Sequence, residues 1–148
     1  MVTVADYPIL WELGRAAALC NNAELIRKDE AWKVEGDPME GALLAFSGKT
    51  GFDGPETQIQ WTRTDLITFD AQHKFMATLN HDHENNACVF VKGAPEAVLA
   101  MCREQRLGSN ETEPLNHAYW HKQAEFIAAQ GQRVLALAAK PMKPEHTV

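Results

Sequence analysis

The chain has 148 residues, of which 45% are hydrophobic and 23% charged, and its formal net charge is −6. This composition is typical of one globular domain with its own core, and the acidic balance argues against a nucleic-acid-binding protein. No apolar run approaches the roughly 20 residues that span a bilayer, and the N-terminus lacks the basic and apolar regions of a secretory signal. Any site for an anion must therefore be a local cationic pocket.

Neither a disulfide framework nor a metal site is indicated. The three cysteines, Cys20, Cys88 and Cys102, are odd in number and lack a CxxC spacing, so we expect buried thiols in a reducing compartment. Residues 81–84 offer His, Asp, His and Glu, but such a polar loop is usually solvated, and metal ligands usually come from separate elements. We predict no metal site.

The first third of the chain predicts two helices and a hairpin. A helix is expected over about residues 7–21, followed by strands at 24–27 and 32–35 joined by a polar turn. A second helix opens at Pro38, because Asp37 is a good N-cap and proline suits the first helical position. Glu40 follows the cap by three residues, the partner position of a capping box.

A possible phosphate-binding loop at residues 48–50 fails on its spacing. Gly48, Lys49 and Thr50 resemble the end of such a loop, but the motif needs a glycine five positions earlier, where Leu43 stands. We therefore expect residues 47–54 to be a helix end and a loop.

The remainder of the chain alternates between strands and helices. Helices are expected over 55–63, from Pro95 to about 102, and over 115–130, where Tyr119, Phe126 and Ile127 form the apolar stripe. Strands are expected at 66–69, 74–79, 89–92 and 133–140, and polar loops at 80–86 and 103–114.

Residues 89–96 form the stretch with the clearest chemical meaning. Three β-branched or aromatic residues predict a buried strand, which ends at Lys92, turns at Gly93 and enters a helix at Pro95. A lysine at a strand end, beside a glycine and a helix N-terminus, is suited to bind an anion.

Four segments resemble motifs of the nucleotide-binding domain of P-type ATPases. Residues 92–96 read Lys-Gly-Ala-Pro-Glu, and residues 36–40 are similar to Gly-Asp-Pro-Thr-Glu with Met39 in place of Thr. Residues 69–76 match Phe-x-x-x-x-Lys-x-Met, and residues 131–138 resemble the closing Gly-x-Arg-x-Leu-Ala-x-Ala strand. They occur in the family's order, and their forms are most similar to bacterial pumps of the calcium-ATPase-like branch.

This resemblance implies a fold and a domain division. The expected class is α+β, a mostly antiparallel β-sheet of about six strands flanked by helices. Residues 1–140 would form a single nucleotide-binding domain, and residues 141–148 an exit linker toward an absent phosphorylation domain.

The resemblance also implies an ATP site. Adenine would stack on Phe69, because an exposed aromatic face can stack on a base. The other implied contacts are Glu40, Lys74 and Lys92 around the base, Gly93 where the nucleotide approaches, and Arg133 and Leu135 along the phosphate or ribose side.

Other roles remain open for these residues. Phe69 could be a core aromatic, Glu40 a helix-capping residue and Arg133 a surface residue. Compared with the family, Asp70 adds negative charge near the pocket and Ala71 removes a possible phosphate contact.

In a full-length enzyme of this family, Mg-ATP would present its γ-phosphate to an aspartate in a separate domain, and hydrolysis would drive cation transport. The expected partners are ATP and the phosphorylation and actuator domains of the same chain. The expected location is the cytoplasmic side of an integral membrane protein in the plasma or inner membrane, with this piece itself not inserted. The chain lacks Asp-Lys-Thr-Gly-Thr, so we expect it to bind ATP without forming a phosphoenzyme.

Two alternatives are kept. One is a domain of the same fold that serves as an interaction module and no longer binds nucleotide. The other is a self-contained ATP hydrolase or kinase, against which the failed phosphate-loop spacing argues.

Overall fold

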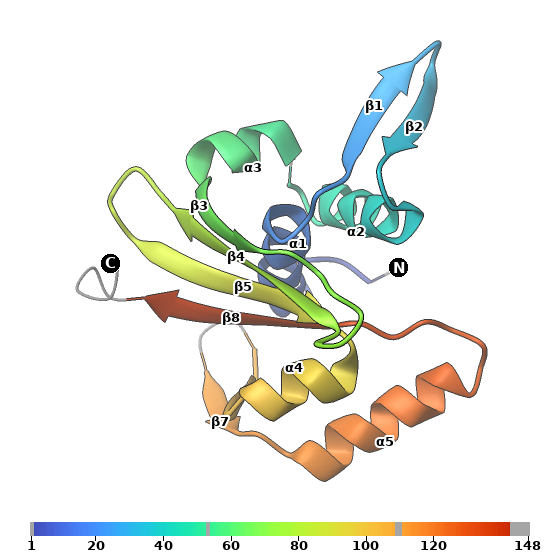
Figure 1. Ribbon diagram of the computed structural model, residues 1–148, viewed down its shortest axis with the longest axis vertical. Helices are drawn as coiled ribbons and strands as arrows, with labels where there is room; N and C mark the ends of the chain where they lie inside the picture. The colour runs from blue at the N-terminus through green and yellow to red at the C-terminus, as the bar shows by residue number, and fades with distance from the viewer. Residues whose placement is uncertain (1, 53, 109–110, 143–148) are drawn as a thin grey trace.

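A four-stranded antiparallel sheet forms the centre of the molecule (Figure 1). The computed structural model describes residues 2–52, 54–108 and 111–142. The sheet has the order β3-β4-β5-β8, with strands β3 (Thr62–Ile67), β4 (Phe75–His81), β5 (Ala87–Gly93) and β8 (Ala136–Met142). The predicted α+β class with antiparallel strands is confirmed.

Helices lie on both sides of this sheet. Figure 1 shows α1, α2 and α3 on one side, and α4 and α5 on the other. Their bounds are α1 (Ile9–Leu19), α2 (Pro38–Lys49), α3 (Gly54–Gln60), α4 (Pro95–Met101) and α5 (His117–Ala128). Helix α2 therefore includes residues 47–49, which the sequence analysis placed in a helix end and loop.

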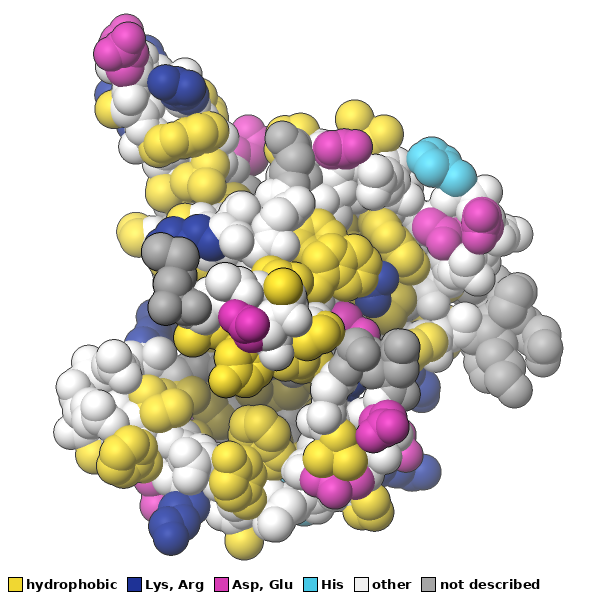
Figure 2. All heavy atoms as spheres, turned by 180° about the vertical axis from the view of Figure 1, so that it is seen from behind, with side chains coloured by type: hydrophobic (Ala, Val, Ile, Leu, Met, Phe, Trp, Pro, Cys, Tyr) yellow, Lys and Arg dark blue, Asp and Glu magenta, His cyan; other side chains and the backbone are white. Residues whose placement is uncertain are grey.

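A hairpin of β1 (Glu24–Lys28) and β2 (Ala31–Glu35) projects from the α2 side. Its two-residue turn has φ of 52° at Asp29 and 64° at Glu30, the left-handed geometry of a tight hairpin turn. Val34 lies so close to Gly41 of α2 that a Cβ added there would collide with it. Hydrophobic side chains are exposed along this hairpin on the back face (Figure 2).

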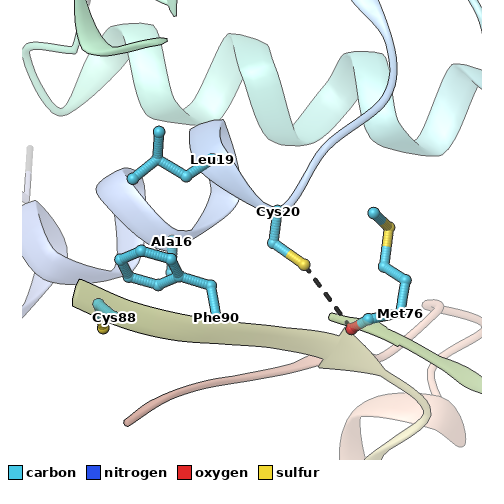
Figure 3. Packing of buried hydrophobic residues seen from close by; sticks show 6 residues of the cluster. All are labelled: Ala16, Leu19, Cys20, Met76, Cys88 and Phe90. Carbon is cyan, nitrogen blue, oxygen red and sulfur yellow. Dashed lines mark hydrogen bonds between the residues drawn. The ribbon is translucent and has the colours of Figure 1, made fainter. Parts of the chain in front are cut away.

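The core lies between α1 and the sheet (Figure 3). Ala16, Leu19 and Cys20 follow helical spacing and form one face of α1. Across from them lie Met76 of β4 and Cys88 and Phe90 of β5, and the Cys20 thiol donates to the Met76 carbonyl at 3.7 Å. The packing of α1 on this face of the sheet therefore joins the helix to both β4 and β5.

Strand alternation carries Lys92 onto the same face as this core. Cys88, Phe90 and Lys92 occupy alternate positions of β5, and Lys92 is paired in register with Met76 of β4. The lysine is only 3% exposed. A charged residue thus continues the buried row of the strand and requires a partner inside the protein.

Several strand boundaries differ from the sequence prediction, and those of β3 and β8 bear on the candidate residues. β3 ends at Ile67, so Phe69 lies beyond it rather than within it. β8 begins at Ala136 rather than at 133, and it continues to Met142 beside β5. The strand therefore includes the first two residues of the predicted exit linker, and residues 143–148 lie outside the described ranges.

The predicted loop at 103–114 contains a small hairpin, β6 (Glu104–Arg106) and β7 (Thr112–Pro114). Within the described residues the chain thus has eight strands instead of about six. The hairpin is held by backbone pairing and by a 2.6 Å bond from Gln105 Nε2 to Glu113 Oε1. Its polar side chains lack the apolar alternation by which strands are recognised in a sequence.

Helix α5 does not bury the stripe that its spacing predicts. Within the described structure no residue of α5 is buried, and Tyr119 and Phe126 are both exposed. The predicted helix is confirmed, and its apolar stripe stays largely exposed because spacing creates an apolar face without determining which element covers it.

We expect Phe90→Ala to lower the free energy of unfolding by about 3–5 kcal/mol, because a fully buried ring is replaced by a cavity. Phe126→Ala, at a position that is 64% exposed, should change it by no more than about 0.5 kcal/mol. Urea denaturation measures both. Equal losses would contradict the assignment of the core.

Candidate functional site

One cavity of about 360 Å³ opens where α2 begins, β5 ends and the chain approaches β8. All the site residues named from the sequence line it. The complete lining is Asn22, Asp37, Met39, Glu40, Phe69, Lys74, Met76, Lys92, Gly93, Ala94, Arg133, Val134 and Leu135. Segments from five parts of the chain thus meet around one space.

A buried ion pair lies in the cavity wall. Lys92 Nζ donates to Glu40 Oε1 at 2.7 Å, and the two side chains retain only 4% and 11% of their exposure. Glu40 Oε2 also accepts from the Asn22 backbone N–H at 3.4 Å. A carboxylate with two such partners is held in a defined orientation.

The first turn of α2 positions Glu40. Asp37 Oδ1 accepts from the backbone N–H groups of Met39 at 2.8 Å and Glu40 at 3.3 Å, which confirms Asp37 as the N-cap. The predicted return bond from Glu40 to the cap is not formed among the described residues. Its carboxylate bonds Lys92 instead, because a buried charge-assisted bond is stronger than one to an exposed amide.

Cys20 does not compete with Glu40 for the lysine. Burial raises the pKa of the Cys20 thiol to about 11, although the nearby Lys92 ammonium lowers it. The thiol therefore stays protonated near neutral pH, and Glu40 is the counter-ion of Lys92. All three cysteines are free; Cys20 and Cys88 are buried as expected, whereas Cys102 is half-buried.

Phe69 lies at the cavity with 56% of its surface exposed, so its alternative interpretation as a core aromatic is wrong. The turn after it is fixed by Asp70, whose Oδ1 accepts from the N–H groups of Gln72 and His73 at 2.9 and 2.7 Å. Asp70 Oδ2 lies 2.6 Å from His73 Nδ1. The backbone and ring of His73 lower the pKa of Asp70, and its carboxylate does not line the cavity.

Lys74 ends this turn at the exposed side of the cavity. Its φ of 59° is left-handed, and its carbonyl accepts from the Ala94 N–H at 2.9 Å. Its Nζ lies 3.3 Å from Glu96 Oε1 in an exposed ion pair. The pKa of Glu96 is lowered by a hydrogen bond from its own backbone N–H and by Lys74.

Gly93 allows the neighbouring strand β4 to approach its backbone closely. A Cβ added to Gly93 would lie 2.8 Å from both Cα and Cβ of Phe75 and would collide with the Lys74 carbonyl. The glycine is therefore required by the packing of β4 on β5. Its role toward a nucleotide stays a prediction.

Arg133 and Leu135 line the cavity from the segment between α5 and β8. Arg133 is exposed and Leu135 is half-buried. Asn22 was not among the site residues predicted from the sequence, although it lines the cavity and its N–H donates a hydrogen bond to Glu40. Nothing in the local sequence indicates this position, since it follows from where α1 ends.

No group of three or more His, Cys, Asp or Glu side chains within the described ranges is arranged to hold a metal ion. Asp82, from the His/Asp/Glu run, instead accepts from the backbone of Glu84 and Asn86 at 2.9 and 2.8 Å. In that same part of the chain, no helix has the length and apolarity to cross a membrane.

The antiparallel α+β fold thus surrounds one cavity with an exposed aromatic ring, apolar side chains and two lysines. The family model described as "P-type ATPase, cytoplasmic domain N" matches residues 10–147. The chain belongs to this family.

Curated relatives agree with this assignment. The chain is 37% identical over 139 residues to the cation-transporting ATPase pma1 of Synechocystis, which covers 94% of this chain and 15% of that protein. It is 31% identical to calcium-transporting ATPase 1 of Lactococcus lactis, over 99% of this chain and 16% of the relative. It is 34% identical to the sodium/potassium exporting P-type ATPase cta3 of Schizosaccharomyces pombe, over 85% of this chain and 12% of that protein. The chain thus spans about a sixth or less of their lengths, and their names differ in the ion.

We expect Glu40→Gln to lower the free energy of unfolding by about 3 kcal/mol, because it leaves the Lys92 charge buried without a counter-ion. Glu96→Gln breaks the exposed pair with Lys74 and should cost less than about 1 kcal/mol. Urea unfolding at neutral pH compares them. A loss for Glu40→Gln no larger than that for Glu96→Gln would show that the inner pair is not buried as described.

Gly93→Ala should destabilise the protein by about 1–3 kcal/mol, since the new methyl group meets the β4 backbone. Gly48→Ala is the matched control, because an added Cβ there meets nothing within 4 Å and Gly48 lies inside α2. The control should be neutral or stabilise by about 0.5–1 kcal/mol. Thermal and urea unfolding report both, and a neutral Gly93→Ala would disprove the close approach of β4.

Proposed function

We propose that this chain is the ATP-binding domain of an ATP-driven cation pump. The observation that carries the proposal is the meeting of all the residues predicted for an ATP site, from Glu40 to Leu135, around one cavity. Membership in the P-type ATPase family supports the same function.

In this proposal the adenine ring stacks on the exposed face of Phe69. Base–aromatic stacking contributes roughly 1–3 kcal/mol per base. Met39, Met76 and Leu135 add apolar surface to the same cavity. The Glu40 carboxylate, oriented by Lys92 and Asn22, accepts a hydrogen bond from the exocyclic amino group of adenine. GTP presents a carbonyl at that position and is therefore bound less well.

The phosphates extend toward the exposed side, where Lys74 and Arg133 provide positive charge in an acidic chain. Lys74 is paired with Glu96 in solvent, and such pairs are weak. A phosphate can therefore take the place of Glu96 as the partner of Lys74. The γ-phosphate would be directed away from the domain toward an aspartate elsewhere in the full-length protein.

In this proposal the phosphorylation step and cation transport are carried out by other segments of the full-length protein. We propose that the full-length enzyme uses Mg-ATP, and that its phosphorylation and actuator domains are the partners of this domain. The pump would reside in the plasma or inner membrane with this domain on the cytoplasmic side. This chain would bind ATP without being phosphorylated.

A second candidate is an interaction module that no longer binds nucleotide. It is favoured by the ion pairing of both cavity lysines, since Lys92 has Glu40 and Lys74 has Glu96 as partners. Ala71 also lacks the side chain that contacts phosphate in some family members. Direct ligand titration discriminates between the two candidates.

We expect ATP to shift the backbone amide NMR signals around Glu40, Phe69, Lys92 and Gly93, with GTP producing smaller changes. Phe69→Ala should weaken ATP binding by roughly tenfold or more, because it removes the stacking surface.

Phe126→Ala is the control, since it removes an exposed phenyl ring that does not line the cavity. It should leave the ATP titration unchanged. The absence of saturable shifts in the wild type at millimolar ATP would refute ATP binding and favour the interaction module.

A further inference from the structure

Arg63 makes more hydrogen bonds to main-chain and side-chain acceptors than its place in β3 requires. Its Nη1 donates to Asn22 Oδ1 at 2.7 Å, and its Nη2 donates to the carbonyls of Leu19 at 3.1 Å and Asn21 at 2.6 Å. The β3–β4 register shifts between Arg63 and Asp65. Such irregularities often redirect a side chain, and here the guanidinium reaches the end of α1.

The end of α1 supplies acceptors that need donors. Carbonyl groups at a helix C-terminus have no partner within the helix, and a cation there is favoured by the helix dipole. α1 has no basic residue in its last turn. Arg63 supplies that cation from another element, and its planar fork binds several acceptors at once.

The segment held by Arg63 also holds Glu40. Asn21 is buried, and its Nδ2 donates to the Glu40 carbonyl at 2.9 Å and to the Ala17 carbonyl at 3.1 Å. The Asn22 N–H donates to Glu40 Oε2, and Glu40 Oε1 accepts from Lys92. A continuous series of bonds thus leads from Arg63 to the ion pair.

Arg63 itself does not line the cavity that contains the ion pair. It lines a second cavity of about 360 Å³ on the other side of Asn22, which lines both. The hydrogen-bonded route from Arg63 to the first cavity runs through residues 21 and 22.

We propose that Arg63 is a positioning residue that fixes Asn21 and Asn22 and thereby orients the Glu40–Lys92 pair for ligand recognition. Without the guanidinium, Asn22 loses the hydrogen bond at its Oδ1 and becomes less well fixed. Its N–H then holds Oε2 of Glu40 less firmly. The pair persists but is less well ordered. The consequence for ATP rests on the proposed function; the consequence for the ion pair does not.

The test follows the Lys92 ammonium group by ¹⁵N NMR of the 148-residue chain labelled in its lysines, and the signal is assigned by its loss in Lys92→Met. A buried, paired ammonium exchanges slowly with water and gives a separate signal. We expect Arg63→Gln to shift or broaden it and to weaken ATP binding, measured by calorimetry, by roughly five- to tenfold. Arg63→Lys, which keeps the charge without the fork, should give a smaller change in both.

Arg27→Gln removes the same group from the exposed hairpin and should leave both measurements unchanged. The proposal is overturned if Arg63→Gln lowers the free energy of unfolding but keeps the Lys92 signal and the ATP affinity of the wild type. If Arg63→Gln does not fold, Arg63→Lys decides by the same readouts. If the wild type does not bind ATP, the proposed function fails, and the Lys92 signal alone decides the role of Arg63.

Discussion

A charged pair inside a protein must recover the hydration that both groups lose, and the Lys92–Glu40 pair can do so only in a narrow geometry. The two residues are 52 positions apart in the chain and lie on β5 and α2, so the pair forms only when the helical layer packs correctly on the sheet. This contact holds one oxygen of the Glu40 carboxylate in the cavity wall, and the Asn22 N–H holds the other. A replacement of either charge affects the ligand site and the fold together, because they share these atoms.

The turns around the cavity are ordered by local hydrogen bonds rather than by a large core. Asp37 caps α2, and Asp70 holds the turn between Phe69 and Lys74 through its bonds to His73. These carboxylates therefore act on the backbone of the turns that carry the cavity-lining residues. Glu40 and Glu96 are paired with lysines, whereas Asp37 and Asp70 keep their charge and use it to accept hydrogen bonds from the backbone and from His73. Of the two cavity lysines, Lys74 is the one whose partner is exposed, so in the proposed function it is the lysine that exchanges its carboxylate for a phosphate.

Predictions from the sequence succeeded where the signal is local. The N-cap at Asp37, the tight hairpin around Asp29 and the strand–turn–helix passage through Gly93 all depend on neighbouring residues. They failed where another element decides the outcome. Glu40 has the spacing of a capping box, but its carboxylate pairs with Lys92 of another element. The helical spacing of Phe126 likewise did not determine its exposure, which depends on what covers α5. The β6–β7 hairpin was missed because polar strands carry no apolar alternation.

By itself the sequence determined the α+β class, most of the element order and a set of candidate residues, because periodicity, caps and short motifs are properties of neighbouring positions. Only the tertiary structure decided that those candidates share one cavity, that Phe69 is exposed there and that Lys92 is buried against Glu40. It alone brought Arg63 to the end of α1 and Asn22 to the cavity wall. The physical reason is that a side-chain partner across a sheet–helix contact is selected by packing, and packing depends on the whole chain.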